Sequence, residues 1–357
     1  MNDNQAASDQ RVQWYRTPLG KPTMAALNAR SDFKGYRQSL GHLGLLFLTG
    51  SLAVYGVGRW PWWAVAMIVF VHGTCFAFMI NAVHELVHRT VFKTRALNDF
   101  FAKVFAFLGW IQYEMFHTSH MRHHQYTLHH PDDMEVVLPM RVMVKQFFRQ
   151  GFVNWGGLKW HVKNTLRVAR GQFGGEWELK LFPEDDADKR SGPILCAKFV
   201  LRGHATIVVV SLLLAALVDL RWLMLPLLTT FAPFYGGWLF FLCNNTQHIG
   251  LQDGVPDFRL CCRTFTVNPI VQFLYWHMNF HTEHHMYAAV PCYNLSKLHR
   301  AIKHDLPPCP HGLMATWQEI AAIQKLQDAD PTYQHVAAIP QREIEKQEFA
   351  SHEPQIV

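Results

Sequence analysis

Histidine residues form three closely spaced clusters whose spacing suits metal binding. The clusters are one H-x-x-x-H pair and two H-x-x-H-H triplets, which comprise His84, His88, His120, His123, His124, His281, His284 and His285. Residues three or four positions apart share one face of a helix, so each cluster can aim its rings at one point. Neutral imidazole is the commonest metal ligand among side chains. The clusters therefore predict a multi-histidine metal site.

A ninth histidine follows a long uncharged run. His248 comes four residues after Asn244, so on a helix the two side chains would share a face, with Asn244 able to hold a metal-bound water. One zinc ion takes about four ligands. Nine imidazoles are too many for one such ion and suit two ions, each with a coordination position left open.

Four apolar runs are long enough to place these clusters beside a membrane. Half of the 357 residues are hydrophobic and only 17% are charged, against about a quarter charged in a typical soluble domain. A helix needs about 20 apolar residues to cross the bilayer core. We therefore expect an all-α integral membrane protein with a helical cap that carries the histidine clusters, and with four transmembrane helices at about 39–58, 61–84, 199–219 and 222–243.

The basic residues indicate the orientation. Six of them precede the first run and many lie between the second and third runs, whereas each short connection on the other side holds one arginine, Arg59 or Arg221. Because cytoplasmic loops carry the excess of positive charge, both termini and the cap are predicted to be cytoplasmic, at the inner membrane in a bacterium. The chain would comprise a polar arm (1–37), a membrane domain (38–309) and a polar tail (310–357).

Imidazole-rich sites accept iron, zinc, copper or nickel. A redox-active metal beside a membrane indicates electron transfer or oxygen chemistry on an apolar substrate, so iron is the expected metal. Metal-bound histidines usually donate their second ring N–H to a carboxylate or similar acceptor. The candidate carboxylates are Glu85, Asp132, Asp133 and Glu283, for each of which a solvated or ion-paired surface role is the alternative.

Several other residues have two interpretations. His117 and His277 are either ligands or hydrogen-bonding neighbours of the clusters, and His299 is interpreted as a surface residue. Histidines within the apolar runs, such as His42, His72 and His204, are interpreted as satisfied by backbone groups or water. A basic stripe beside two tryptophans predicts an interfacial helix that binds anionic lipid or the head group of the substrate; the stripe comprises Lys159, Lys163, Arg167 and Arg170.

The order of the three clusters over four apolar runs resembles the membrane fatty acid desaturase/hydroxylase superfamily, over about residues 40–305. Residues 279–295, NFHTEHHMYAAVPCYNL, are similar to the third histidine box and its sequel in bacterial desaturases. The resemblance implies a di-iron centre that uses O2. Its nine ligands would be His84, His88, His120, His123, His124, His248, His281, His284 and His285.

The resemblance implies oxidation of a fatty acyl chain, most simply desaturation, which introduces a C=C bond. Hydroxylation, or oxidative decarboxylation of a free fatty acid to a terminal alkene, would use the same centre and stays open. Some acyl-CoA desaturases have one more residue in the first box, so the spacing of His84 and His88 favours acyl-lipid or free-acid substrates, or hydroxylation.

The sequence shows no motif of an electron carrier, so a separate ferredoxin, rubredoxin or cytochrome b5-type donor with its own reductase is implied. A metal transporter or sensor is the alternative from another class. Transporters place polar ligands near the bilayer midplane, whereas these clusters lie outside the apolar runs. Nucleic-acid binding is not expected of a chain with four membrane spans.

Overall fold

The computed structural model describes residues 11–340, and the parts of the predicted arm and tail that fall on 1–10 and 341–357 lie outside the described residues. Within 11–340 the regular secondary structure is helical, apart from three isolated β-bridges. The prediction of an all-α chain is confirmed. The division into arm, membrane domain and tail stays a prediction.

Three helical segments of the described chain are long and apolar enough to cross a membrane, and they correspond to the first three predicted spans: Asp32–Gly56, Trp62–Val87 and Ala187–Leu217. The first is α2, the second comprises α3 (Trp62–Phe76) and α4 (Met79–Val87), and the third is α10. Side chains cap two of them, because Ser31 accepts a hydrogen bond from the Lys34 amide of α2 and Asp186 accepts one from the Lys189 amide of α10.

The predicted helix over 222–243 is wrong as a single helix. The chain here forms η1 (Leu220–Leu223), α11 (Met224–Leu228), η2 (Ala232–Phe234) and α12 (Trp238–Asn244). Pro226 and Pro233 have no amide hydrogen to donate, and Gly236 has a φ of +69°. A Cβ on Gly236 would lie 2.5 Å from the Phe70 carbonyl oxygen of α3. The chain therefore bends at this point and packs closely on α3.

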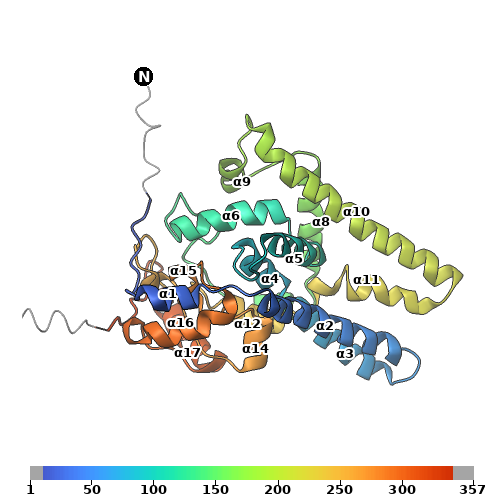
Figure 1. Cartoon of the computed structure of the whole chain (residues 1–357). Helices are drawn as coiled ribbons and strands as arrows, with labels where there is room; N and C mark the ends of the chain where they lie inside the picture. Colours follow the sequence, from blue (N-terminus) through green and yellow to red (C-terminus); the bar gives the residue numbers. More distant parts are fainter. Residues whose placement is uncertain (1–10, 341–357) are drawn as a thin grey trace, which may run out of the picture.

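Two helical hairpins project from the same side of the molecule (Figure 1). One is made of α2 and α3, and the other of α10 and the returning segment with α11. Three buried histidines bond these elements to their neighbours: His42 to the Cys75 carbonyl (2.9 Å), His72 to that of Leu228 (2.8 Å) and His204 to that of Phe107 (2.9 Å). The prediction that backbone groups satisfy these three histidines is confirmed.

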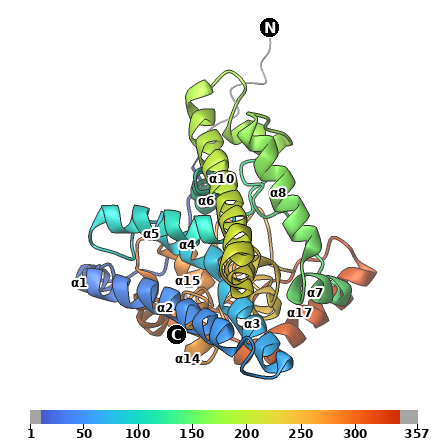
Figure 2. The same cartoon turned by 90° about the vertical axis from the view of Figure 1, so that its right-hand side faces the viewer.

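The remaining helices form a body at the base of the hairpins. Helix α8 (Trp155–Ala169) lies along α10 (Figure 2). The other helices of the described chain are α1 (Lys21–Leu27), α5 (Arg95–Leu108), α6 (Tyr113–Tyr126), α7 (Val144–Gly151), α8 (Trp155–Ala169), α9 (Glu176–Leu181), α13 (Phe258–Cys261), α14 (Pro269–Leu274), α15 (His281–Met286), η3 (Cys292–Asn294), α16 (Leu295–Ile302), η4 (Lys303–Asp305) and α17 (Gly312–Ala329).

Both ends of the described chain pack on this body. Near the N-terminus, Arg16 donates to the carbonyl of Met286 (2.8 Å) and Thr17 donates to the carboxylate of Asp305 (2.7 Å). Near the C-terminus, Trp317 of α17 donates its indole N–H to the carbonyl of Leu242 (3.0 Å). The contact of Arg16 reaches Met286, the last residue of the helix that carries the third histidine cluster.

Candidate metal centre

Short helices carry the three histidine clusters, as the spacing predicted. The first cluster lies at the end of α4, where the apolar span runs on and His88 caps the helix. The second lies on α6 and the third on α15. His248 differs from the prediction, because α12 ends at Asn244 and His248 lies in a bend beyond it. Asn244 and His248 therefore share no helical face.

The structure gathers eight of the nine predicted histidine ligands into two groups. The five-histidine group comprises His84, His88, His120, His124 and His284, and the three-histidine group comprises His248, His281 and His285 with Cys262. Within each group the ligand atoms all lie within 4.8 Å of one another. His123 lies beside the three-histidine group, with its ring centre 5.0 Å from that of His285.

The Nε2 atoms within these groups lie at the separations expected of ligands on a common ion. His88 and His120 are 3.2 Å apart at Nε2, His284 and His124 are 3.1 Å apart, and His281 and His248 are 2.9 Å apart. Two nitrogens each about 2.1 Å from an ion, at right angles, are about 3.0 Å apart. The residues present therefore fit a metal ion in each group.

Carboxylates face the opposite side of several rings. Glu85 Oε1 lies 3.3 Å from His84 Nδ1 and 3.1 Å from His284 Nδ1, although neither contact has the alignment of a hydrogen bond. Glu135 lies 3.0 Å from Nδ1 of His120. At His120 the hydrogen bond to Glu135 is consistent with an Nδ1 proton that points to the carboxylate and leaves Nε2 as the ligand atom.

The remaining histidines near the second group have mixed partners. Asp133 lies 2.7 Å from His123 Nδ1, whereas His248 Nδ1 donates to the carbonyl of Cys261 (2.7 Å). His285 Nδ1 lies 3.1 Å from the Thr127 hydroxyl. Glu85 and Asp133 thus contact cluster histidines as predicted.

Burial keeps most of these imidazoles neutral. It lowers the pKa of His120, His124 and His284 well below the ordinary value, and the neighbouring histidines add to the shift. Burial also lowers the pKa of His248 to about 3. A metal ion binds the unprotonated ring, so these residues present the form that binds metal at neutral pH.

His123 is the exception to this lowering of the pKa, because its pKa is raised. Burial alone would lower its pKa, but the hydrogen bond from the ring to Asp133 and the charge of that carboxylate raise it. Burial raises the pKa of Asp133, and the same contact with His123 outweighs that effect and lowers it. The His123 ring and the Asp133 carboxylate therefore each favour the charged form of the other.

Two predicted carboxylates do not contact cluster histidines. Asp132 pairs with Arg122 (2.9 Å) and Lys180 (3.0 Å), and its side chain is 40% exposed, so it takes the surface role that was the alternative. Glu283 is fully buried and contacts His299 and the Thr264 hydroxyl. The position of Glu283 inside the third cluster suggested a ligand partner, but the turn of α15 directs its side chain away.

Sequence reasoning missed Glu135, His299 and Cys262. Glu135 comes 15 residues after the histidine it contacts, and Cys262 comes from the connection between α13 and α14. No periodic pattern links either residue to a cluster, so no sequence signal was present. His299, interpreted as a surface residue, has a side chain only 18% exposed and pairs with Glu283. Of the ambiguous histidines in the described chain, neither group includes His117 or His277.

The basic stripe lies on α8, as predicted. Lys159, Lys163 and Arg170 are exposed, and Trp155 and Trp160 are 66% and 60% exposed beside them. Arg167 differs, because its guanidinium donates to Glu178 (2.6 Å) and to the side chain of Asn164 (2.5 Å). Lys159, Lys163 and Arg170 therefore lie exposed on the surface, whereas Arg167 is paired with Glu178.

A family model described as "Fatty acid desaturase" matches residues 60–317, which include all three clusters and His248. No curated protein matches the chain.

The two histidine groups predict two bound ions per chain. His124→Ala removes a ligand from the five-histidine group and His281→Ala removes one from the other, so each variant should lose most of one ion, as measured by metal analysis of purified protein. His117→Ala is the control, because His117 stacks on Tyr113 with ring centres 5.9 Å apart and belongs to neither group. If His124→Ala and His281→Ala kept both ions, the grouping would be refuted.

Glu85 and Asp132 form a matched pair of carboxylates for a second test. Glu85→Gln should lower metal affinity at the five-histidine group by about 10–100-fold, the usual effect of losing a partner that orients a ligand. Asp132→Asn should leave the affinity unchanged, because Asp132 pairs with surface cations. Titration against a competing chelator measures both. Equal effects of the two substitutions would contradict the role of Glu85.

Proposed function

Because the chain belongs to the fatty acid desaturase family, we propose that it is a membrane-bound, O2-dependent di-iron oxidoreductase that desaturates a fatty acyl chain. The observation that carries this proposal is the pair of adjoining histidine groups, whose donor atoms lie within 4.8 Å of one another in each group. The family indicates an oxidoreductase that acts on lipid, and the two groups supply enough neutral nitrogen ligands for two metal ions.

The proposed ligands divide between two irons. The five-histidine group would hold one, and the three-histidine group together with His123 would hold the other, with Asn244 contacting it through a water. Two irons supply, when bound, the oxidising power to remove hydrogen from an unactivated C–H bond with O2. The chain's own residues orient the imidazoles through Glu85, Glu135 and Asp133. The burial of the rings excludes bulk water from the centre.

The proposed membrane arrangement follows the two hairpins. The α2–α3 and α10–α11 hairpins would enter the bilayer from the side on which both described ends of the chain lie. The interrupted segment from η1 to α12 would make the fourth crossing. Non-helical backbone is tolerated at membrane depth where protein covers it, and here Gly236 packs against α3. The termini and the centre would be cytoplasmic, where a ferredoxin, rubredoxin or cytochrome b5-type donor and its reductase would deliver electrons.

The proposal is tested by product analysis. Lipids, free fatty acids and volatiles from cells that express the chain are compared, by mass spectrometry, with those from cells expressing His281→Ala. Desaturated acyl chains that depend on His281 are expected, and Asp132→Asn should give the same products as the unmodified chain. Hydroxylated acids or terminal alkenes would instead identify hydroxylation or decarboxylation at the same centre. The absence of any His281-dependent product would refute acyl oxidation.

The basic stripe on α8 is the proposed site for the substrate head group. Lys159, Lys163, Arg167 and Arg170 line a shallow groove of about 500 Å³, which also contains Leu158, Val162 and Leu166. Cations beside apolar side chains suit a carboxylate or phosphate attached to an alkyl chain. Adhesion to anionic lipid, worth about 1 kcal/mol per basic residue, is the competing role for the same stripe.

Single alanine variants in detergent micelles separate these two roles. Binding of the head group predicts that Lys159→Ala, Lys163→Ala or Arg170→Ala raises KM sharply or shifts the oxidised position, because the held head sets which carbon reaches the centre. Arg167→Ala should instead lower stability, since Arg167 bonds to Glu178. Unchanged KM and product position in all three variants would refute head-group binding at the stripe.

A further inference from the structure

A cleft of about 810 Å³ separates the two helical hairpins, with α2 as one wall and the segment of η1 and α11 as the other. The end of the cleft nearest the body is lined by Leu43, Phe76 and Leu108, and the end at the hairpin tips is lined by Arg59 and Arg221. The cleft is therefore predominantly apolar along its length, and its charged side chains lie at the tips.

Polar contacts join the two walls of the cleft. The Thr49 hydroxyl of α2 lies 2.8 Å from His72 Nδ1, and His72 Nε2 donates to the carbonyl of Leu228 in α11 (2.8 Å). A Cβ on Gly50 would lie 3.5 Å from His72 and 3.8 Å from Leu228, which is ordinary van der Waals contact. The walls therefore meet at this depth without crowding, and the cleft is open beside Ser51, which is exposed.

Two arginines without carboxylate partners lie at the tips. Arg59 and Arg221 come from the two short connections, and a Cβ on Gly58 would lie 4.0 Å from a terminal nitrogen of Arg221. The Arg59 guanidinium lies 4.6 Å from the centre of the Tyr55 ring and donates to the carbonyl of the same residue. Within residues 11–340 neither guanidinium forms an ion pair. Asp219 also lines the cleft, but its carboxylate accepts from the Arg221 amide (2.7 Å). Two cations and one anion leave this end with a net charge of +1.

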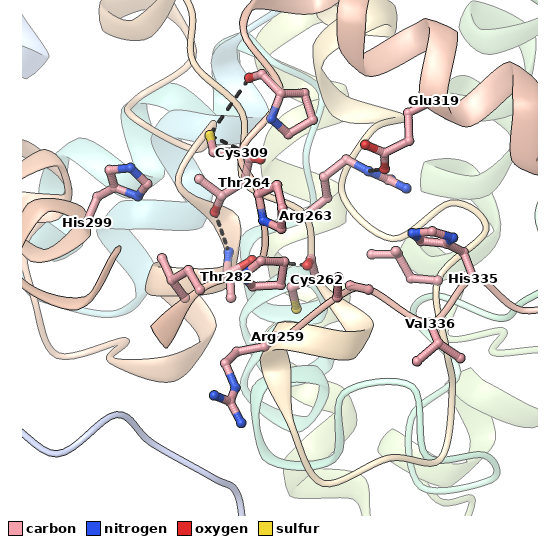
Figure 3. A pocket seen from close by; sticks show the side chains of 17 residues that line it. Arg259, Cys262, Arg263, Thr264, Thr282, His299, Cys309, Glu319, His335 and Val336 are labelled. Atoms are coloured by element: carbon pink, nitrogen blue, oxygen red, sulfur yellow. Dashed lines mark hydrogen bonds and ion pairs between the residues drawn. The ribbon is translucent and has the colours of Figure 1, made fainter. Parts of the chain in front are cut away.

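The pocket in Figure 3 differs from the cleft, although two arginines line it as well. In that pocket of about 290 Å³, Arg259 pairs with Asp305 (2.6 Å) and Arg263 pairs with Glu319 (3.0 Å). Carboxylates of the chain already neutralise these cations. The positive charge at the hairpin tips has no such partner in the described chain, so it is available to an anionic ligand.

Tryptophans mark the hairpin tips as the level of the lipid head groups. Four of them lie at the tips with 37–81% of each exposed, and they are Trp60, Trp62, Trp63 and Trp222. Tryptophan is enriched where a membrane meets water, because its ring is apolar and its N–H is polar. The two arginines therefore lie at head-group level, with the apolar part of the cleft inside the hydrocarbon.

The length of the cleft suits one lipid chain. The part of α2 that lines it runs from Leu43 to Tyr55, which is about 18 Å at 1.5 Å per residue. One leaflet of a hydrocarbon core about 30 Å thick is about 15 Å deep. An acyl chain whose phosphate lies at the tips would therefore extend along the whole apolar length.

We propose that the cleft binds one phospholipid of net charge −1, such as phosphatidylglycerol, from the leaflet at the hairpin tips. Its phosphate lies at Arg59 and Arg221, a head-group hydroxyl donates to Asp219, and one acyl chain fills the apolar length. Contacts of arginine with phosphate are charge-assisted and can be bidentate. The inference rests on the membrane arrangement in the proposed function and not on the oxidation chemistry. The site shares no lining residue with the groove on α8.

The test measures lipid binding to the full chain purified in detergent, by native mass spectrometry with dioleoyl phosphatidylglycerol and dioleoyl phosphatidylcholine added in turn. One phosphatidylglycerol should bind, with higher affinity than phosphatidylcholine. Arg221→Gln should weaken its binding by about tenfold, the usual effect of losing a hydrogen bond to a charged group. Arg141→Gln is the matched control, because it removes one positive charge from the body, where Arg141 pairs with Asp328 (2.9 Å). This control should bind the lipid as the unmodified chain does.

Ser51→Phe tests whether an acyl chain occupies the cleft. Ser51 is exposed on α2, so the added ring extends into the cleft without disturbing packed side chains, and it should displace the lipid while both arginines remain. Phosphatidylglycerol binding that survives Ser51→Phe or Arg221→Gln unchanged, or phosphatidylcholine that binds equally well, overturns the site. These readouts do not depend on turnover. Selective lipid binding by a chain that forms no oxidised acyl product supports the site and contradicts the proposed function alone.

Discussion

The structure depends on the close packing of nine imidazoles, of which seven are buried and two, His88 and His124, are partly buried. Buried polar atoms are almost always hydrogen-bonded, yet the Nε2 atoms of His88, His120 and His124 lie 3.0–3.2 Å from one another. Burial keeps these rings neutral. The lone pairs of neighbouring Nε2 atoms therefore face each other unless a cation or a proton lies between the two nitrogens. A cation bound in each group would relieve this repulsion. The packing of four distant chain segments therefore favours metal binding at the two groups.

The surrounding helices position the histidine clusters in different ways. The second membrane-length segment continues as α4 and carries the first cluster directly beyond its apolar part. Helices α6 and α15 are short and polar, and they receive their position from neighbours, such as Thr282, which bonds to the connection after α13. Carboxylates behind the rings set which nitrogen faces the centre. Glu85 and Glu135 lie behind rings of the five-histidine group, and Asp133 lies behind His123 beside the other group.

Sequence periodicity predicted the parts of this arrangement that lie on helices. The spacing within each cluster placed the rings on common faces, and the apolar runs located α2, α3 and α10. It failed at 222–243, because composition alone does not show that Pro226, Pro233 and the close approach of Gly236 to α3 interrupt the helix. It also failed at Glu135 and Cys262, since loops bring them to the centre and loop paths depend on tertiary contacts rather than on a repeat.

The central claim is that each histidine group binds its own metal ion. Anomalous X-ray scattering at the iron absorption edge, from crystals of the full chain purified with iron, tests this claim most directly. The account predicts two anomalous peaks, one enclosed by His84, His88, His120, His124 and His284 and the other beside His248, His281 and His285. A single peak, or peaks that lie away from these nitrogens, would contradict it.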